Sequence, residues 1–488
     1  MFMEKADDAL YEAFRSKDVR FDGRFFIGVS STKIYCRPIC RAKHPKRENC
    51  TFFSSAAQAE QAGYRPCLLC RPELAPGRSF VDASSSLAHR AAQLMEENCG
   101  TGQSLEALCA KLGCTSRHLR RVFIEEYHVT PIQYLQTCRL LLAKNLLTDT
   151  NLSVLDVAMA AGFGSLRRLN DLFQKHYHLS PSALRKNTAK GAGQAGEIAV
   201  NIGYRPPYRW EEILGFLSSR AILGIEKIED GKYMRTVRLP DRNGKVHSGY
   251  ICVQNNPQKN ALLVTLCDAL VPVFSQVLAC VKHLFDLYCD PDAVYETLQK
   301  LDERKPGLCV KGLRVPGCFH AFETSVRAIL GQQITVKAAS TLAGKVAMAF
   351  GTPVKTGISG LTCTFPVLAD ILSLGENIQE EFGKLGVIAA RSRCILELAK
   401  SLESGAIRLE GCIDPEAEMQ KLMQIKGIGR WTANYIAMRV MGWPDAFLET
   451  DAGIRHALPG YAPEELLSIS QNWRPWRSYA TMNLWNSL

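Results

Sequence analysis

The stretch LMQIKGIGRWTANYIAMR, residues 422–439, places two helical patterns on either side of Gly427-Ile428-Gly429. Two glycines in so short a connection predict a tight hairpin with little room for side chains. Such a hairpin presents backbone N–H groups at the start of a helix, which suits a DNA phosphate. A plain helix-to-helix connection is the alternative, because a lone Gly-x-Gly is a weak signal.

The residues around this hairpin are more specific than the hairpin itself. GIGRWTANY is followed by FLETDAGIRHALPGY, which places Asp451 22 residues after Gly429. This pattern resembles the helix-hairpin-helix DNA glycosylases, and within them the AlkA type, 3-methyladenine DNA glycosylase II. The resemblance runs from about 197 to 488 and includes RPPYRWEEILGFLSSRA and RVPGCFHAFETSVRAILGQQITV. A mixture of strand-like and helical sequence patterns predicts an α+β N-terminal subdomain at 197–290. Helical patterns almost throughout predict an all-α domain at 291–488.

The resemblance implies a reaction and an aromatic pocket. Asp451 corresponds to the family's catalytic aspartate, which stabilises the oxocarbenium-like sugar as the bond to an alkylated base such as 3-methyladenine breaks. The base must be flipped out of the duplex to be reached. A cationic base is attracted by electron-rich rings, and the corresponding residues here are Phe216, Trp431, Tyr435 and Trp485. For any one of these rings, core packing is the alternative.

Contacts with DNA are implied at two further places. Gln333 stands where the best-known member of the family inserts an apolar wedge into the gap in the duplex, a departure that also leaves the range of substrates open. Gly427 and Gly429 stand where the hairpin meets a phosphate. The resemblance also implies a monovalent cation at the backbone carbonyls of Met423, Ile425 and Gly427.

Two points concern the kind of activity. A lyase of this superfamily carries a lysine just after the hairpin, where this chain has Trp431, so a monofunctional glycosylase is expected. Ala452 and Asn486 replace expected aromatic residues, which leaves the range of alkylated bases open. The alternative is a transcription regulator whose glycosylase fold reads damage without catalysis. Asp451 within the full FLETDAGIR context argues against that alternative.

Residues 79–190 contain an internal repeat. FIEEYHVTP at 123–131 matches FQKHYHLSP at 173–181, an offset of 50 residues. Each copy reads as a short helix, a turn holding Gly113 or Gly162, and a longer helix, which is the helix-turn-helix pattern. The segment resembles the paired helix-turn-helix domain of AraC-type regulators, and a linker is predicted at 191–196. We expect this linker to keep the regulatory and glycosylase modules apart.

One helix of each copy has a basic face. When residues 116–128 are placed on a helix that turns 100° per residue, the arginines gather on the face opposite Leu119, Val122 and Phe123. A helix with arginines on one face and apolar residues on the opposite face is suited to lie in a DNA groove. An ordinary amphipathic helix with a charged outer face is the alternative. The predicted DNA-contacting arginines are Arg117, Arg120 and Arg121 in the first copy and Arg167 and Arg168 in the second.

Two cysteine pairs precede the repeat. Cys36 and Cys40 lie in IYCRPICRAKH, and Cys67 and Cys70 lie in RPCLLCR. Four thiolates close a tetrahedral Zn²⁺ site, and a purely structural zinc domain is the simplest interpretation. Their basic surroundings also suit a DNA backbone, and the DNA-contacting residues predicted here are Arg37, Lys43 and Arg47.

KIYCRPICRAKHPKRENCTFF…AGYRPCLLCRPE resembles the N-terminal domain of Ada, the adaptive-response protein, over residues 1–78. The resemblance implies that Cys36, as a zinc thiolate, takes a methyl group irreversibly from a DNA methylphosphotriester. Loss of one negative charge would then raise affinity for a promoter and activate repair genes. No Pro-Cys-His occurs in the chain, so the second, O6-methylguanine acceptor of many Ada proteins is expected to be absent.

Composition agrees with a DNA-binding protein. The net charge is +11, and residues 1–190 hold 27 Lys and Arg against 18 Asp and Glu, which favours a polyanion partner; a solvated basic surface is the alternative. No secretory signal or membrane span is apparent, and 18 cysteines without an export signal indicate free thiols and metal ligands in the cytoplasm. We therefore expect a multidomain, mainly α protein with α+β parts, monomeric, with promoter and alkylated double-stranded DNA as partners and RNA polymerase as a candidate.

Overall fold

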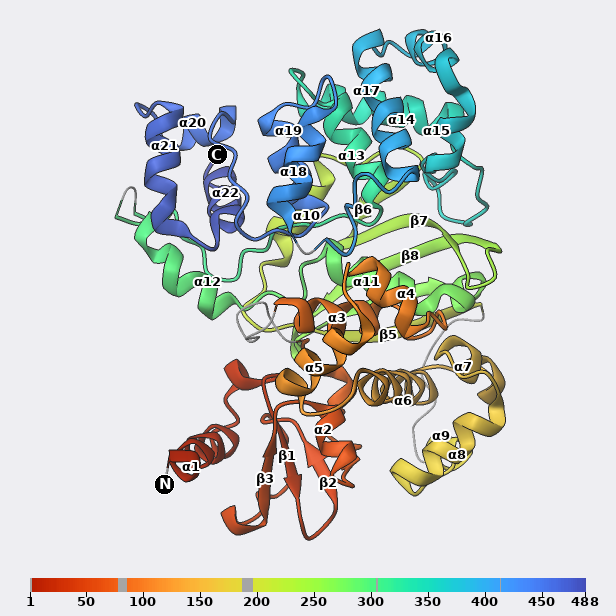
Figure 1. Cartoon of the computed structure of the whole chain (residues 1–488), viewed down its shortest axis with the longest axis vertical. Coiled ribbons are helices and arrows are strands. Elements are labelled where there is room, and N and C mark those ends of the chain that lie inside the picture. The colour runs from red at the N-terminus through yellow and green to blue at the C-terminus, as the bar shows by residue number, and fades with distance from the viewer. Residues whose placement is uncertain (1, 78–85, 187–195, 304–305, 413) are drawn as a thin grey trace.

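The computed structural model describes residues 2–77, 86–186, 196–303, 306–412 and 414–488. In Figure 1 a small red domain lies at one end of the molecule and a blue helical domain at the other. Helices of residues 86–186 and a five-stranded sheet lie between them. The mainly helical, multidomain architecture predicted from the sequence is confirmed.

The N-terminal domain is a small sheet between two helices. Its elements are α1 (Phe2–Arg15), β1 (Phe26–Val29), β2 (Ile34–Cys36), β3 (Cys50–Phe53), α2 (Ala56–Gln61) and β4 (Arg65–Pro66). The strand order is β3-β1-β2-β4, with β2 and β4 parallel. One cluster of apolar residues joins α1 to the cysteines, and a second joins β1, β2 and α2.

Residues 86–186 form two helical units that share one long helix. The helices are α3 (Ser86–Glu97), α4 (Leu105–Lys111), α5 (Ser116–Tyr127), α6 (Pro131–Asp149), α7 (Val154–Ala160), α8 (Leu166–Tyr177) and α9 (Pro181–Lys186). Gly113 and Gly162 have φ of +63° and +78°, as turns between paired helices require.

The repeated residues mark equivalent helix ends. α5 and α8 each stop at a left-handed histidine, His128 with φ 57° and His178 with φ 54°. The predicted helix 116–128 therefore ends one residue early. Pro131 and Pro181 then open the next helix of each copy, because proline fits the first helical turn.

The sheet after residue 196 is antiparallel throughout. Its strands are β5 (Glu197–Gly203), β6 (Glu226–Glu229), β7 (Lys232–Pro240), β8 (Val246–Asn256) and β9 (Ala261–Cys267), in the order β5-β9-β8-β7-β6. Two helices, α10 (Trp210–Ser218) and α11 (Phe274–Leu284), contribute to the same apolar core.

The remaining chain is helical around a separate core. Its helices are α12 (Pro291–Leu298), α13 (Ala321–Leu330), α14 (Val336–Phe350), α15 (Leu368–Leu374), α16 (Ile378–Lys384), α17 (Ala389–Glu403), α18 (Pro415–Gln424), α19 (Arg430–Arg439), α20 (Ala452–Ala457), α21 (Pro463–Ile469) and α22 (Arg477–Asn486). The predicted hairpin joins α18 to α19, and Gly427 at its tip has φ +104°. A Cβ there would also meet Cys394 at 3.3 Å.

The modules touch one another, so the prediction that a linker keeps them apart is wrong. Residues 191–195 of that linker lie outside the described residues. Helices α6, α7 and α8 share one continuous core with β5, β7, β8 and β9. Arg24 of the N-terminal domain pairs with the buried Asp290, and a Cβ on Gly203 in β5 would lie 2.1 Å from the Leu74 carbonyl oxygen. The regulatory half and the glycosylase half therefore form one packed body.

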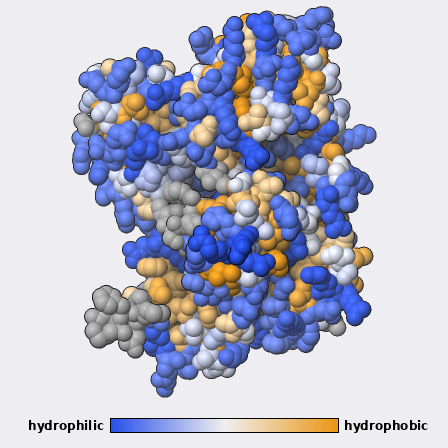
Figure 2. Space-filling model, viewed as in Figure 1, coloured by the Kyte–Doolittle hydropathy of each residue, from blue (hydrophilic) through white to orange (hydrophobic). Residues whose placement is uncertain are grey.

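The face of the molecule shown in Figure 2 is mostly hydrophilic. Among the described residues, no helix is both long and apolar enough to cross a bilayer.

Candidate functional sites

The sheet register brings the two cysteine pairs together. Tyr35 of β2 lies opposite Pro66 of β4, so Cys36 and Cys67 leave the sheet side by side. The sulfurs of Cys36, Cys40, Cys67 and Cys70 all lie within 4.8 Å of one another. That spacing and donor set fit a tetrahedral Zn²⁺ with Zn–S bonds of about 2.3 Å. The fifth nearby cysteine, Cys50, points elsewhere and contacts the Lys46 carbonyl oxygen.

Arg37 supports the cysteine cluster from behind. Its backbone N–H donates to Cys70 Sγ at 3.3 Å, and its Nη1 donates to the Cys70 carbonyl at 3.1 Å. The guanidinium is buried and pairs with the buried Asp22. The predicted contact between Arg37 and DNA is therefore wrong, because its charge is already neutralised inside the domain. Polar groups of this kind orient metal ligands.

The other two basic residues of this domain differ in availability. Lys43 is exposed. Arg47 is bound to the carboxylates of Asp7 and Asp8 on α1, at 3.4 and 3.0 Å. A DNA phosphate would have to compete with these two acids for Arg47, whereas Lys43 is open to it.

The helices α5 and α8 each have an apolar face that is buried and an arginine face that is exposed. Leu119 and Phe123 are fully buried beneath α5, and Leu169 and Phe173 occupy the same positions beneath α8. All five predicted arginines are exposed: Arg117, Arg120, Arg121, Arg167 and Arg168. Arg121 makes an exposed ion pair with Glu125 at 3.3 Å, which is weak enough to exchange for a phosphate.

Asp451 lies in a cleft of ≈ 1180 Å³ in the helical domain. It caps α20 by accepting a hydrogen bond from the Ile454 backbone N–H at 3.1 Å. Trp485 Nε1 donates to Asp451 Oδ1 at 2.8 Å, and Trp431 Nε1 donates to Oδ2 at 3.0 Å. Both carboxylate oxygens are thus held in place by indole groups that line the same cleft.

The predicted aromatic pocket is only partly available. Trp431 and Tyr435 stack at 5.2 Å between ring centroids, and Phe216 and Trp485 at 6.1 Å. Phe216, however, does not line the cleft. The guanidinium of Arg220 covers its ring at 3.8 Å, so the prediction that Phe216 offers its face to a base is corrected.

The loop and hairpin beside the cleft place the other predicted DNA contacts. Gln333 is exposed, lines the cleft and has φ +55° between α13 and α14. Gly427 and Gly429 line the same cleft. The Gly427 carbonyl, one of the predicted cation ligands, accepts a hydrogen bond from Gln332 Nε2 at 2.8 Å.

Several residues of these sites were not predicted from the sequence. Arg220 and Arg439 stand among the pocket rings, and Tyr35 and Glu60 connect the cysteine domain to the helices. The spacing of Phe216 and Arg220, four residues apart at a helix end, is the one signal that could have identified Arg220.

Sequence profiles of known domains match three segments. The metal binding domain of Ada matches residues 9–73, a helix-turn-helix domain matches 108–187, and the AlkA N-terminal domain matches 199–320. The last match extends 30 residues past the predicted subdomain end at 290.

A full-length relative decides the family. The "Probable bifunctional transcriptional activator/DNA repair enzyme AlkA" of Mycobacterium tuberculosis is 36% identical over 489 residues, which cover 98% of this chain and 96% of that protein. The chain belongs to this AlkA family of bifunctional transcriptional activators and DNA repair enzymes. The predicted resemblances to Ada, to helix-turn-helix regulators and to AlkA glycosylases are thereby confirmed.

Two further relatives of this AlkA family member each match a different part of the chain. DNA-3-methyladenine glycosylase 2 of Escherichia coli is 34% identical over 286 residues, 58% of this chain and 95% of that protein. The bifunctional transcriptional activator/DNA repair enzyme Ada of Escherichia coli is 36% identical over 133 residues, 27% of this chain and 36% of that protein.

Proposed function

We propose that this chain is both a methyl-accepting transcriptional activator and a DNA glycosylase for alkylated bases. The observation that carries the glycosylase is the cleft carboxylate of Asp451, whose two oxygens are fixed by Trp431 and Trp485. The names and coverage of the AlkA and Ada relatives support both activities.

The glycosylase reaction needs little beyond this carboxylate. A ring-alkylated purine is cationic and leaves with the electron pair of the bond between its ring nitrogen and C1′. Asp451 then stabilises the positive charge that develops on the sugar and orients the attacking water. No amine stands at Trp431, where a lyase needs its lysine, so hydrolysis without strand cleavage is proposed. This makes the enzyme monofunctional in its base-removal step.

The cysteine cluster carries the second activity. Zn²⁺ bound by the four thiolates would keep Cys36 ionised and nucleophilic. The Cys36 sulfur forms a bond to the methyl carbon, and the phosphate oxygen leaves with the electron pair as a phosphodiester. Cys36 becomes a neutral thioether, so the domain loses one negative charge, and affinity for promoter DNA rises because phosphate repulsion falls.

Four accompanying proposals remain predictions. These are a monovalent cation at the hairpin carbonyls, recruitment of RNA polymerase by the activated form, a monomeric state and a cytoplasmic location. The cation would share the Gly427 carbonyl with Gln332, because a carbonyl oxygen has two lone pairs.

Two substitutions test the two activities separately. Asp451→Asn should lose nearly all release of 3-methyladenine from alkylated DNA, leaving a small residual rate, while methyl uptake continues. Cys36→Ala should abolish methyl uptake while base release continues, because Cys36 belongs to the N-terminal core, whereas Trp431 and Trp485, which hold Asp451, pack against the core of the helical domain. Mass spectrometry after exposure to DNA methylphosphotriesters should show one methyl adduct on the Cys36 peptide; an adduct on another cysteine would refute the assignment.

A further inference from the structure

Two guanidinium groups stand among the rings of the pocket in which a cationic base is expected to bind. Arg220 lies over Phe216 at 3.8 Å, and Arg439 lies 4.9 Å from Phe216 and 5.6 Å from Tyr435. Arg220, Arg439 and Tyr435 all line the cleft that contains Asp451. Positive charge in this position opposes the binding of a cationic base.

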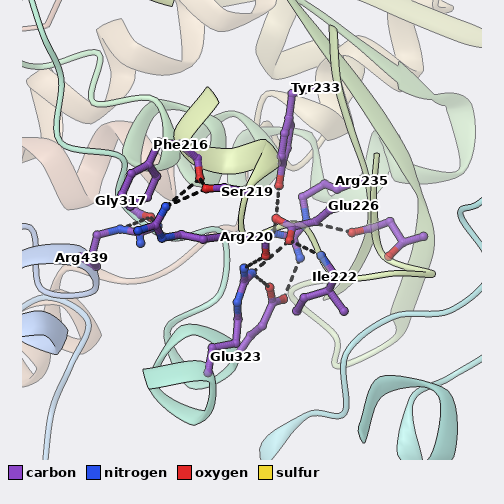
Figure 3. A network of polar contacts seen from close by, with 12 residues as sticks. Phe216, Ser219, Arg220, Ile222, Glu226, Tyr233, Arg235, Gly317, Glu323 and Arg439 are labelled. Carbon is purple, nitrogen blue, oxygen red and sulfur yellow. Dashed lines mark hydrogen bonds and ion pairs between the residues drawn. The ribbon is translucent and has the colours of Figure 1, made fainter. Parts of the chain in front are cut away.

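The pocket charges are not neutralised by the carboxylates nearby. Figure 3 shows Glu226 and Glu323 in a cluster with Arg235, while the Arg220 guanidinium turns away from them towards Phe216 and Arg439. Arg327 pairs with both carboxylates, at 3.1 and 3.2 Å. Neither Arg220 nor Arg439 forms an ion pair within the described part of the chain.

The two arginines are held differently. Arg439 donates to the Pro316 and Gly317 carbonyls and to Tyr435 Oη at 2.7 Å, so its guanidinium is fixed in place. Arg220 Nη1 donates to the Phe216 carbonyl at 3.2 Å and to Ser219 Oγ at 2.8 Å. Burial lowers the pKa of Arg220, which shows that its charge is held at a cost.

We propose that Arg220 is a catalytic residue on the base side of the cleft, which promotes base release by repelling the cationic base and favouring the neutral leaving base. This inference rests on the glycosylase function proposed above. Asp451 acts on the sugar and Arg220 acts on the base.

The charge changes during the reaction give the reason. When the bond between C1′ and the base nitrogen breaks, its electron pair moves to the base. A base alkylated at a ring nitrogen passes from a charge of +1 to zero, while the sugar becomes positive. Repulsion by Arg220 is then relieved as attraction by Asp451 grows, so both groups act more favourably in the transition state than in the bound substrate. Water adds to C1′ and releases its proton, which completes the hydrolysis.

A neutral base provides the contrast. A neutral purine such as hypoxanthine receives the same electron pair and gains negative charge, so Arg220 would favour its departure without opposing its binding. Arg220 should therefore weaken the binding of cationic bases selectively.

The experiment separates rate from affinity. Arg220→Met removes the charge and keeps the side-chain length, Arg220→Lys keeps the charge, and Arg209→Met is a control outside the cleft. Single-turnover release of 7-methylguanine should fall at least tenfold in Arg220→Met and recover in Arg220→Lys. A rate within twofold of the unchanged protein would overturn the proposal.

Affinity is measured in the Asp451→Asn background, in which turnover is negligible over the time of a binding measurement. Adding Arg220→Met should increase the affinity for a duplex containing 7-methylguanine at least threefold more than it increases the affinity for a duplex containing hypoxanthine. An equal change for both duplexes, or weaker binding of both, contradicts repulsion and indicates a structural role. If the unchanged protein releases no base at all, the glycosylase proposal has failed and not the role of Arg220.

Discussion

Tyr35 and Tyr177 donate hydrogen bonds to the same atom, Oε1 of Glu60, at 3.1 and 3.2 Å. Tyr35 precedes Cys36, the proposed methyl acceptor, in β2, and Tyr177 is the last residue of α8. Thr137 of α6 donates to the other oxygen of Glu60 at 2.9 Å. One buried carboxylate thus joins the cysteine domain to both the long helix α6 and the helix α8.

The Glu60 connection should make stability depend on pH. Burial raises the pKa of Glu60 to about 7, although hydrogen bonds from Thr137, Tyr35 and Tyr177 oppose the shift. The folded state holds this proton more tightly than the unfolded state. The stabilisation that protonated Glu60 gives the folded state is therefore complete below about pH 4.5 and is lost as the pH rises through 7, a change on the order of 3 kcal/mol.

Glu60→Gln tests this dependence. The free energy of unfolding is measured with urea at several pH values. The value for Glu60→Gln minus the value for the unchanged protein should increase between pH 4.5 and 8. Glu48→Gln, at an exposed acid of the same domain, should show no such gain. A constant difference across this range would mean that Glu60 does not titrate there.

A second buried acid should behave in the opposite way. Lys144 of α6 donates to Glu73 at 2.5 Å, and both side chains are almost fully buried. Burial raises the pKa of Glu73, but Lys144 and Arg71 outweigh it and hold the pKa below its usual range. This pair therefore stabilises the junction of the first two domains above about pH 4.5, and the stabilisation disappears as the pH falls through the lowered pKa of Glu73.

Lys144→Met should cost about 3–5 kcal/mol at pH 7, because it leaves Glu73 buried beside one cation fewer. The free energy of unfolding in urea measures this. Adding Glu73→Gln to Lys144→Met should recover part of the loss, since the unpaired charge is then removed. A double variant less stable than Lys144→Met alone would contradict this account.

Zinc removal should affect one part of the molecule selectively. The N-terminal core is small and includes the ligands Cys36, Cys40 and Cys67, so metal binding supplies much of its folding free energy. We expect a strong chelator to increase hydrogen exchange in β1, β2 and β4 at least tenfold. The core around α19 and α22 contains no cysteine of the cluster, so its exchange and base release should persist. Equal loss of protection in both cores would contradict this separation.

How far the sequence predicts the molecule depends on the range of each interaction. Gly427, the cysteine spacing and the repeat that contains His128 and His178 are local patterns, and the structure has each in the expected form. Arg37 was misassigned because its partner Asp22 is 15 residues away and becomes visible only when the sheet forms. The four-residue spacing of Phe216 and Arg220 is only a weak hint that Arg220 covers that ring, and no local signal shows that β5 packs against the cysteine domain. Composition and spacing identify donors and ligands, but pairings between distant segments require the fold.

The indoles of the cleft give the sharpest test of how Asp451 is positioned. Trp431→Phe and Trp485→Phe keep an aromatic ring but remove the N–H groups that donate to the carboxylate at 3.0 and 2.8 Å. Because each is a hydrogen bond to a carboxylate, worth about 1.5–3 kcal/mol, each substitution should slow single-turnover release of 7-methylguanine by roughly 10- to 100-fold. In the Asp451→Asn background the same substitutions should slow the residual rate far less, since the N–H groups act through the carboxylate. If each Trp→Phe change costs as much without Asp451 as with it, the indoles contribute by stacking and not by holding the acid.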